Sequence, residues 1–237
     1  SIGGGSEPSP ETFDWIETRI QRLEREITNL GKVADATYKT WAERTVALGQ
    51  EMEKVNEQIS LQESAYNAYM AKAESIGLSA QYKALVQSGG LRIDEITDET
   101  LKENIQNYKE WYEKALDAKD KVEDLRSSLA NLAKTKFDNI TTQFDDMVSD
   151  IDHMLKYITG QLSSVETIGK IAGKSFYDAQ IAQEQQRVIE LTNELGQLQN
   201  ALAEGLASGA IAYGSQMWSE MKKSIYGVEE AIWDAQN

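Results

Sequence analysis

Apolar or small residues recur every three or four positions along the first third of the chain. The repeated positions are Phe13, Ile16, Ile20, Leu23, Ile27, Leu30, Ala34, Thr37, Trp41, Thr45, Leu48, Met52, Val55, Ile59, Gln62, Tyr66, Tyr69, Ala73 and Ile76. Alternating steps of three and four place such residues along one seam of an α-helix, as in coiled coils. No proline interrupts the pattern. It therefore predicts one long helix over residues 13–76.

The regular alternation lapses once, near the middle of this stretch. Thr37, Trp41 and Thr45 follow one another in two successive steps of four. Such a stutter locally unwinds a left-handed supercoil. Gly31 and Gly49 flank it, and each glycine costs up to about 1 kcal/mol relative to alanine inside a helix. We expect a bend or a flexible spot in a continuous helix here, and no break.

A cluster of turn signals between residues 77 and 97 predicts a compact tip. Gly77 is a suitable residue to end the first helix, and Ser79 is a suitable cap for a short helix over residues 80–87. Ser-Gly-Gly at 88–90 ends that helix. Residues 91–96 alternate in polarity, which is consistent with a small extended arm. Thr97 is the expected cap of the next helix.

A second long stripe follows the tip and matches the first in length. Its members are Leu101, Ile105, Tyr108, Tyr112, Ala115, Val122, Leu125, Leu129, Leu132, Phe137, Ile140, Phe144, Met147, Ile151, Met154 and Ile158. Two matched helices joined by a tip are best explained by an antiparallel hairpin spanning residues 11–160. In that hairpin 59–76 packs against 101–112, and 13–30 packs against 144–158.

The pattern loosens after Gly160, so residues 161–174 are the expected linker. A third stripe then comprises Tyr177, Ile181, Val188, Leu191, Leu195, Leu198, Leu202 and Leu206, and a fourth comprises Trp218, Met221, Ile225, Val228 and Ile232. They predict a shorter hairpin over 175–237 with its tip at 205–215. Both prolines lie in residues 1–10, the expected flexible lead-in. The fold class predicted from these stripes is all-α.

Composition narrows the range of partners. The 237 residues contain 24 Lys and Arg against 39 Asp and Glu, a formal net charge of -15, and no cysteine. Binding of nucleic acid through phosphates needs clustered basic residues, and docking on anionic lipid needs them too, so both are disfavoured. Disulfide and thiol chemistry are excluded. No stretch approaches the roughly 20 apolar residues that cross a bilayer.

The beginning of the chain carries no targeting signal that we recognise. It lacks an initiating methionine, a basic region and an apolar core, so it does not read as a signal peptide. We therefore expect the chain to be a segment of a longer protein.

Two motifs suggest a binding site, one for phosphate and one for a metal ion, but each is better explained as ordinary helix or linker sequence. Residues 169–175, Gly-Lys-Ile-Ala-Gly-Lys-Ser, resemble a phosphate-binding loop, but three residues separate the glycines where four are needed, and no strand precedes them. A linker with Ser175 as a helix cap is the better interpretation. Four acidic residues gather near the only histidine, at Asp145, Asp146, Asp150, Asp152 and His153. They lack the glycine turn of a calcium loop, and a solvated helix face explains them.

Other polar residues yield no reaction centre. A single histidine within a helix cannot support a nucleophile triad. Acidic residues pair instead with bases along helix faces, as Glu110 and Lys114 do at a spacing of four. Asn139 begins a glycosylation sequon in mid-helix, a pattern common by chance. We assign no catalytic residue, no metal ligand, no cofactor and no small-molecule substrate, and an enzyme is disfavoured.

The aromatic residues divide into core and surface groups. Tyr66, Tyr69, Tyr108, Trp111 and Tyr112 are expected to pack together near the tip. Aromatic side chains of this size dominate the packing energy of helical cores. Trp15 and Trp233 lie near the two ends of the chain instead. We expect these two tryptophans to be the better candidates for contact with a partner.

Several short sequence segments resemble a known protein family, and the apolar periodicity alone does not account for this resemblance. The relevant segments are Phe13-Asp14-Trp15-Ile16-Glu17, Thr40-Trp41-Ala42-Glu43-Arg44, Ala65-Tyr66-Asn67-Ala68-Tyr69-Met70, Tyr82-Lys83-Ala84-Leu85-Val86-Gln87-Ser88-Gly89, residues 105–114 and residues 136–140. They resemble the tail tape measure proteins of siphophages and prophages of Gram-positive bacteria. The shorter hairpin is similar to the continuation seen in the same proteins.

This resemblance implies a structural virion protein that sets tail length and occupies the lumen of the tail tube. It implies partners among other tail proteins or copies of the chain, and a location in the phage tail after assembly in the host cytoplasm. Family members are usually far longer and carry hydrophobic segments, so this stretch is expected to be a folded module. The alternative from another class is a cellular or secreted coiled-coil adaptor or effector that presents a helical rod to a protein partner.

Overall fold

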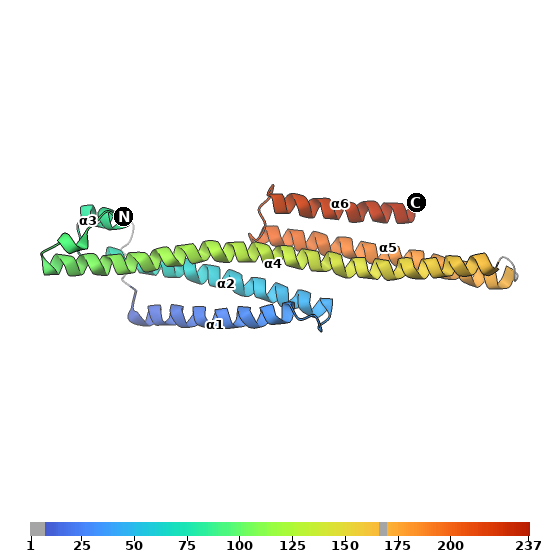
Figure 1. Cartoon of the computed structure of the whole chain (residues 1–237), viewed down its shortest axis with the longest axis horizontal. Helices are drawn as coiled ribbons and strands as arrows, with labels where there is room; N and C mark the ends of the chain where they lie inside the picture. Colours follow the sequence, from blue (N-terminus) through green and yellow to red (C-terminus); the bar gives the residue numbers. More distant parts are fainter. Residues whose placement is uncertain (1–7, 166–169) are drawn as a thin grey trace. The chain divides into compact units, whose positions relative to one another are not determined.

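The computed structural model describes residues 8–165 and 170–237. Within these residues the chain forms α-helices with one short 3₁₀-helix and contains no strand, so the predicted all-α class is confirmed. The helices are α1 (Pro10–Ala34), α2 (Trp41–Glu74), α3 (Ala80–Ser88), η1 (Ile93–Glu95), α4 (Glu99–Val165), α5 (Lys170–Ala207) and α6 (Gln216–Gln236) (Figure 1). The long helix α4 packs against α2 and α5.

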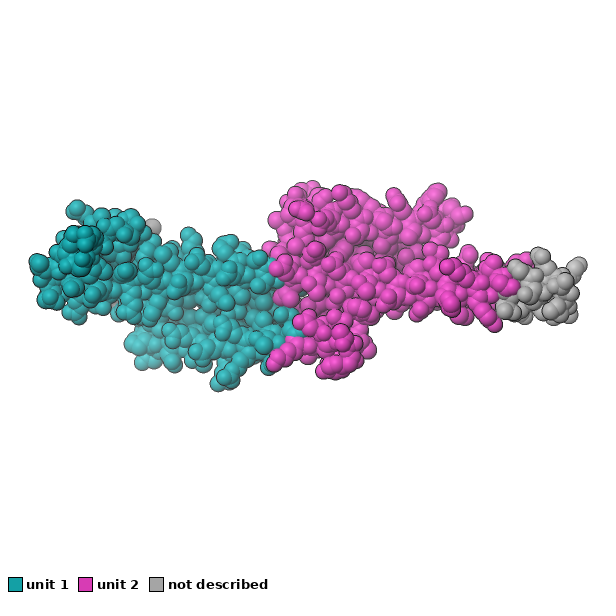
Figure 2. All heavy atoms as spheres, viewed as in Figure 1, with its two compact units in different colours: residues 1–31, 50–129 teal, residues 32–49, 130–237 magenta. Residues whose placement is uncertain are grey.

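The residues group into two compact units (Figure 2). Unit 1 comprises residues 1–31 and 50–129, and unit 2 comprises residues 32–49 and 130–237. Three helices contribute residues to both units, because α1, α2 and α4 each run across a boundary. Each unit has its own buried side chains.

The expectation of one continuous helix over residues 13–76 is wrong. Helix α1 ends at Ala34 and α2 begins at Trp41. The two ends of the intervening turn are capped by side chains. Thr40 accepts a hydrogen bond from the backbone N–H of Glu43 (3.1 Å), and the Glu43 carboxylate accepts one from the backbone N–H of Thr40 (3.0 Å). This reciprocal pair is a capping box, and it starts α2.

The turn is closed from its other side by Arg44. Its Nε donates a hydrogen bond to the carbonyl oxygen of Ala34 at 2.7 Å, so a side chain from the start of α2 satisfies a backbone acceptor at the end of α1. Beneath the turn Ala34, Ala47 and Leu48 are buried, with Leu132 of α4 packed against them. The apolar spacing continues through this region, but it belongs to two helices.

Helix α1 therefore folds back along α2, and the predicted pairing of 13–30 with 144–158 is wrong. In unit 1, Arg19 pairs with Glu57, and Lys54 Nζ lies 3.4 Å from Glu26 Oε2. These pairs run in opposite directions along the two sequences, as antiparallel helices require. The shared core of unit 1 contains Ile16, Leu23, Leu61, Ala65, Ala68 and Ala118.

The tip largely follows the sequence. Ser79 caps α3 by accepting a hydrogen bond from the N–H of Tyr82, and α3 ends at Gly89, whose φ of 71° is left-handed. Ala73 of α2 is buried with Ile105 and Tyr108 of α4, which confirms the packing of 59–76 against 101–112.

Three details of the tip differ from expectation. Helix α2 ends at Glu74, and Gly77 is not among the glycines with positive φ. Residues 93–95 form a 3₁₀ turn in place of an extended arm. Asp98, one residue beyond Thr97, accepts the capping hydrogen bond from the N–H of Leu101 (3.0 Å).

Unit 2 contains a second antiparallel arrangement, formed by α4, α5 and α6. Lys136 Nζ lies 3.2 Å from Glu204 Oε2, and Arg187 Nη1 lies 3.1 Å from Asp152 Oδ1, so α5 runs back along α4. Helix α6 then packs on α5, with Met221 and Ile225 buried. Residues 161–165 and 170–174 are helical, although this region was the expected linker, and 166–169 lie outside the described residues. The expected flexibility of residues 1–7 also falls outside them.

The turn between α5 and α6 lies at residues 208–215, within the predicted tip at 205–215. Gly209 has a φ of 77°, a left-handed conformation that glycine adopts without strain. Ile211 donates its backbone N–H to the carbonyl of Gly205 at 3.0 Å and is itself buried. A side chain at Gly205 would collide with Cδ1 of Ile211 and lie 2.9 Å from its Cγ1. Ser215 caps α6 by accepting from the N–H of Trp218.

Candidate functional site

Three aromatic rings from three helices meet where α1 begins. Phe13 of α1 stacks on Tyr69 of α2 with ring centroids 5.7 Å apart, and the ring of Trp111 from α4 lies 5.1 Å from Phe13 and 6.1 Å from Tyr69. Such pairs stabilise packing by about 0.5–1.5 kcal/mol beyond the burial of area. Ser9 caps α1 by accepting from the N–H of Thr12 (3.2 Å), which fixes the entry of Phe13.

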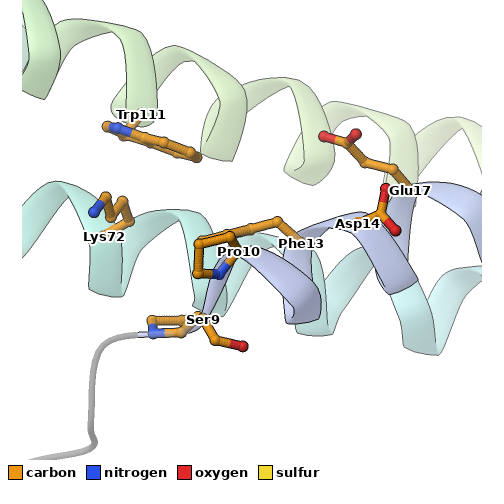
Figure 3. A pocket seen from close by; sticks show the side chains of 8 residues that line it. Ser9, Pro10, Phe13, Asp14, Glu17, Lys72 and Trp111 are labelled. Atoms are coloured by element: carbon orange, nitrogen blue, oxygen red, sulfur yellow. The ribbon is translucent and has the colours of Figure 1, made fainter.

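An open groove of about 680 Å³ lies beside these rings (Figure 3). It is lined by Pro8, Ser9, Pro10, Phe13, Asp14, Glu17, Lys72 and Trp111. Figure 3 shows the indole of Trp111 above the ring of Phe13, with the carboxylates of Asp14 and Glu17 farther along α1. The groove therefore offers an aromatic floor with charges at its edge.

The charges of the groove act on its own aromatic residues. Lys114 Nζ lies 4.4 Å and Lys72 Nζ 5.9 Å from the centroid of the Trp111 ring, so two cations of the chain already contact the indole. Burial raises the pKa of the Tyr69 hydroxyl, and the negative charge of Glu17 adds to the effect. The hydroxyl of Ser9 lies 3.0 Å from that of Thr12 as well as capping the helix. In this arrangement the side chains bind one another and lock α1 onto α2 and α4.

The five tip aromatics divide between two adjoining hydrophobic cores. Tyr66 and Tyr69 pack on the core shared with α1, whereas Tyr108, Trp111 and Tyr112 belong to the tip core. The contact of Tyr69 with Trp111 joins them. Tyr108 is fully buried, and its hydroxyl accepts a hydrogen bond from Gln87 of α3 at 2.8 Å.

Trp15 and Trp233 lie at the surface, with 61% and 65% of their area exposed. Their contact with a partner stays a prediction. Trp41 is also partly exposed, and the guanidinium of Arg44 lies 4.6 Å from its ring centroid.

The acidic cluster lies within α4, as expected. Asp145, Asp146, Asp150 and His153 are exposed, and Asp152 forms the ion pair with Arg187 described above. In the described parts of the chain, no group of three or more acidic, histidine or cysteine side chains is placed to hold a metal ion.

Residues 170–175 of the loop-like motif are helical, so Ser175 lies inside α5 and not at its start, where the sequence had placed it. Gly169 lies outside the described residues. Asn139 is on α4, and its Nδ2 is buried without a hydrogen-bond partner. Glu110 and Lys114 form the expected ion pair at 3.6 Å.

Sequence reasoning missed one buried charge. Glu194 of α5 is 2% exposed, although it is ionisable. Burial raises its pKa to about 7, and the negative charge of Asp145 on α4 contributes to the rise. A signal was present, because Glu194 stands three residues after Leu191 and four before Leu198, both buried. It thus occupies a seam position normally filled by an apolar side chain.

Comparison with known proteins places the chain in no established group. No protein family, curated protein or solved structure matches it. Among the described helices, none is long and apolar enough to span a membrane.

Proposed function

We propose that this chain is a structural protein that acts through helix packing, as a folded segment of a phage tail protein of the tape measure type. It would contact other tail proteins or further copies of itself through helical surfaces. The resemblance of its aromatic segments to tape measure proteins supplies the biological class. The fold supports a structural role, because it consists of long helices that pack side by side.

The observation that carries the proposal is helix α4. Its 67 residues form one uninterrupted helix, and buried residues recur along it at Ile105, Val122, Leu129, Phe137, Phe144, Ile151 and Ile158. At these spacings the buried residues form one continuous apolar seam along many turns of the helix. A protein that works by lateral packing needs this kind of continuous seam, and the candidate groove serves to seat α1 on it.

The surface charge supports a protein partner in preference to nucleic acid. The net charge of -15 opposes contact with phosphates. An acidic surface also keeps extended helical proteins from associating indiscriminately. The exposed rings of Trp15 and Trp233 are the apolar contacts available to such a partner.

The test is made in the phage or prophage that encodes the chain. An in-frame deletion of residues 11–160 is introduced, and purified particles are measured by electron microscopy and mass spectrometry. We expect peptides of the chain in wild-type tails, and tails that are shortened or fail to assemble in the deletion strain. A deletion of residues 1–7 alone is the matched control and leaves tail length unchanged. Intact tails of normal length that lack the chain would refute the proposal.

A cellular or secreted adaptor is the second candidate, and the two exposed tryptophans favour it. In that case Trp15→Ala and Trp233→Ala weaken capture of one defined protein partner while the helical content stays unchanged. Circular dichroism and a binding measurement on the isolated chain separate this outcome from the tail function. Tail particles that contain the chain would count against the adaptor.

A further inference from the structure

The seam between α4 and α5 contains a carboxyl group where the rest of the seam is apolar. Glu194 lies in the buried stripe of α5 with Leu191, Leu198 and Leu202. Removing a charged carboxylate from water is costly unless a partner compensates it. Here the charged group that acts on Glu194 across the seam is another carboxylate, Asp145 of α4. The geometry therefore favours the neutral form of Glu194.

The two bases that form ion pairs between α4 and α5 do so with carboxylates other than Glu194. Arg187, seven residues before Glu194 on α5, is held by Asp152 of α4 at 3.1 Å. Lys136 of α4 is held by Glu204 of α5 at 3.2 Å. Among the described contacts, no hydrogen bond or ion pair reaches the Glu194 carboxyl group.

The nearby carboxylates of α5 and α6 have other partners. Glu190 of α5 accepts a hydrogen bond from Gln186, and Glu220 of α6 accepts one from Gln216. The remaining charged residues of α6, which packs on α5, are Lys222, Lys223, Glu229, Glu230 and Asp234. The shift of Glu194 arises from burial first and from Asp145 second, and neither cause lies on α6.

We propose that the α4–α5 seam of unit 2 is a proton-dependent closure, which holds most tightly when Glu194 carries a proton and loosens when Glu194 and Asp145 are both ionised. The closure responds to the binding of a single proton by the carboxyl group of Glu194. The closure is a property of the fold, and it stands whether or not the chain belongs to a phage tail.

The sign of the effect follows from proton binding. Glu194 titrates near 4.5 in the unfolded chain and near 7 in the native protein. The native state therefore holds an extra proton between these pH values, and stability falls as the pH rises through that interval. Below about pH 4.5 the carboxyl group is neutral in both states and its contribution to the pH dependence vanishes.

The experiment compares the wild-type chain with Glu194→Gln, which keeps the shape of the side chain and stays neutral. Urea unfolding is followed by circular dichroism at pH 5 and pH 8. Between these values we expect the unfolding constant of the wild type, relative to the variant, to rise on the order of 50-fold. Glu184→Gln, at an exposed position on the same helix, is the matched control and shows no such change.

A direct titration keeps the proposal testable even if the variant folds poorly. Carbon NMR of the wild-type chain labelled at glutamate carboxyl carbons is expected to show one glutamate titrating near pH 7, assigned through its absence in Glu194→Gln. Asp145→Asn is expected to lower that midpoint and reduce the pH dependence of unfolding. A Glu194 midpoint near 4.5, or equal effects of Glu194→Gln at both pH values, would overturn the proposal.

Discussion

The two units use the same kind of helical seam in different ways. In unit 1 the seam of α2 and α4 is filled by apolar and aromatic side chains, and α1 adds Ile16 and Leu23 to the same core. Its buried polar side chains among the described residues are the uncharged amides Gln58 and Gln62, and Gln58 Nε2 lies 3.5 Å from Glu24 Oε1. In unit 2 the seam of α4 and α5 includes Glu194 opposed by a like charge.

The difference extends to the surface. Exposed large apolar side chains gather in α4 and α5 of unit 2, at Met147, Met154, Tyr157, Tyr177, Ile181 and Ile189. Unit 1 has Trp15 as its exposed counterpart among the described residues. A seam that buries an ionisable carboxyl group has a stability that depends on pH, whereas a seam of apolar side chains and uncharged amides does not.

The largest expected effect comes from breaking the closed seam. Leu129 is 2% exposed in α4, so Leu129→Asp places an unpaired charge in the core. We expect a loss of about 3–5 kcal/mol and a melting temperature lower by several degrees or more, measured by circular dichroism. Ser128→Asp, at the exposed neighbouring position, is the control. An unchanged melting curve for Leu129→Asp would contradict the packing described for α4.

An intermediate effect tests the packing of the turn between α5 and α6 on the end of α5. Gly205→Ala adds a methyl group against the buried side chain of Ile211, and overpacking of this kind costs about 1–3 kcal/mol. The matched control is Gly227→Ala in α6, where nothing lies within 4 Å and alanine stabilises the helix by up to about 1 kcal/mol. Thermal unfolding should therefore shift in opposite directions for the two variants. Equal shifts would argue against the contact of Gly205 with Ile211.

The smallest effect tests the turn between α1 and α2. Thr40→Ala removes the capping box, and we expect a loss of about 1 kcal/mol in urea unfolding at neutral pH. Thr37→Ala, in the same turn but outside the capping box, is the control.

The other half of the capping box, the Glu43 carboxylate, should contribute in a pH-dependent way, and Glu43→Gln tests it. The hydrogen bond from the Thr40 backbone lowers the pKa of Glu43, with Lys39 and the Thr40 hydroxyl contributing. This cap is therefore present above about pH 4.5 and is lost as the pH falls through the lowered pKa. A cost of Glu43→Gln that stays constant down to pH 2 would show that the charge of Glu43 plays no part in the cap.

The sequence predicted those features that depend on local periodicity and capping. The seam of α4, the cap at Ser79 and the turn at Gly89 follow from residue types whose effects are local. The exposure of Trp15 and Trp233 also agrees with their place outside the stripes.

The features that escaped prediction arise where two signals compete. Thr37, Trp41 and Thr45 continue the helical spacing across a real turn, and the capping box of Thr40 and Glu43 was the stronger signal. Because that turn was not predicted, α1 was expected to pack against residues 144–158 and not against α2. Glu194 was overlooked because the stripe of this helix was traced through its apolar residues, Leu191, Leu195 and Leu198, alone.

The hydrogen bond from Arg44 to Ala34 spans only ten residues of sequence. Contacts that close short loops form rapidly, because little chain entropy is lost. The pairing of α1 with α2 is thus available as soon as residue 74 has been synthesised, well before α4 is complete. The nascent chain would present a preassembled two-helix template, onto which α4 docks as it emerges from the ribosome.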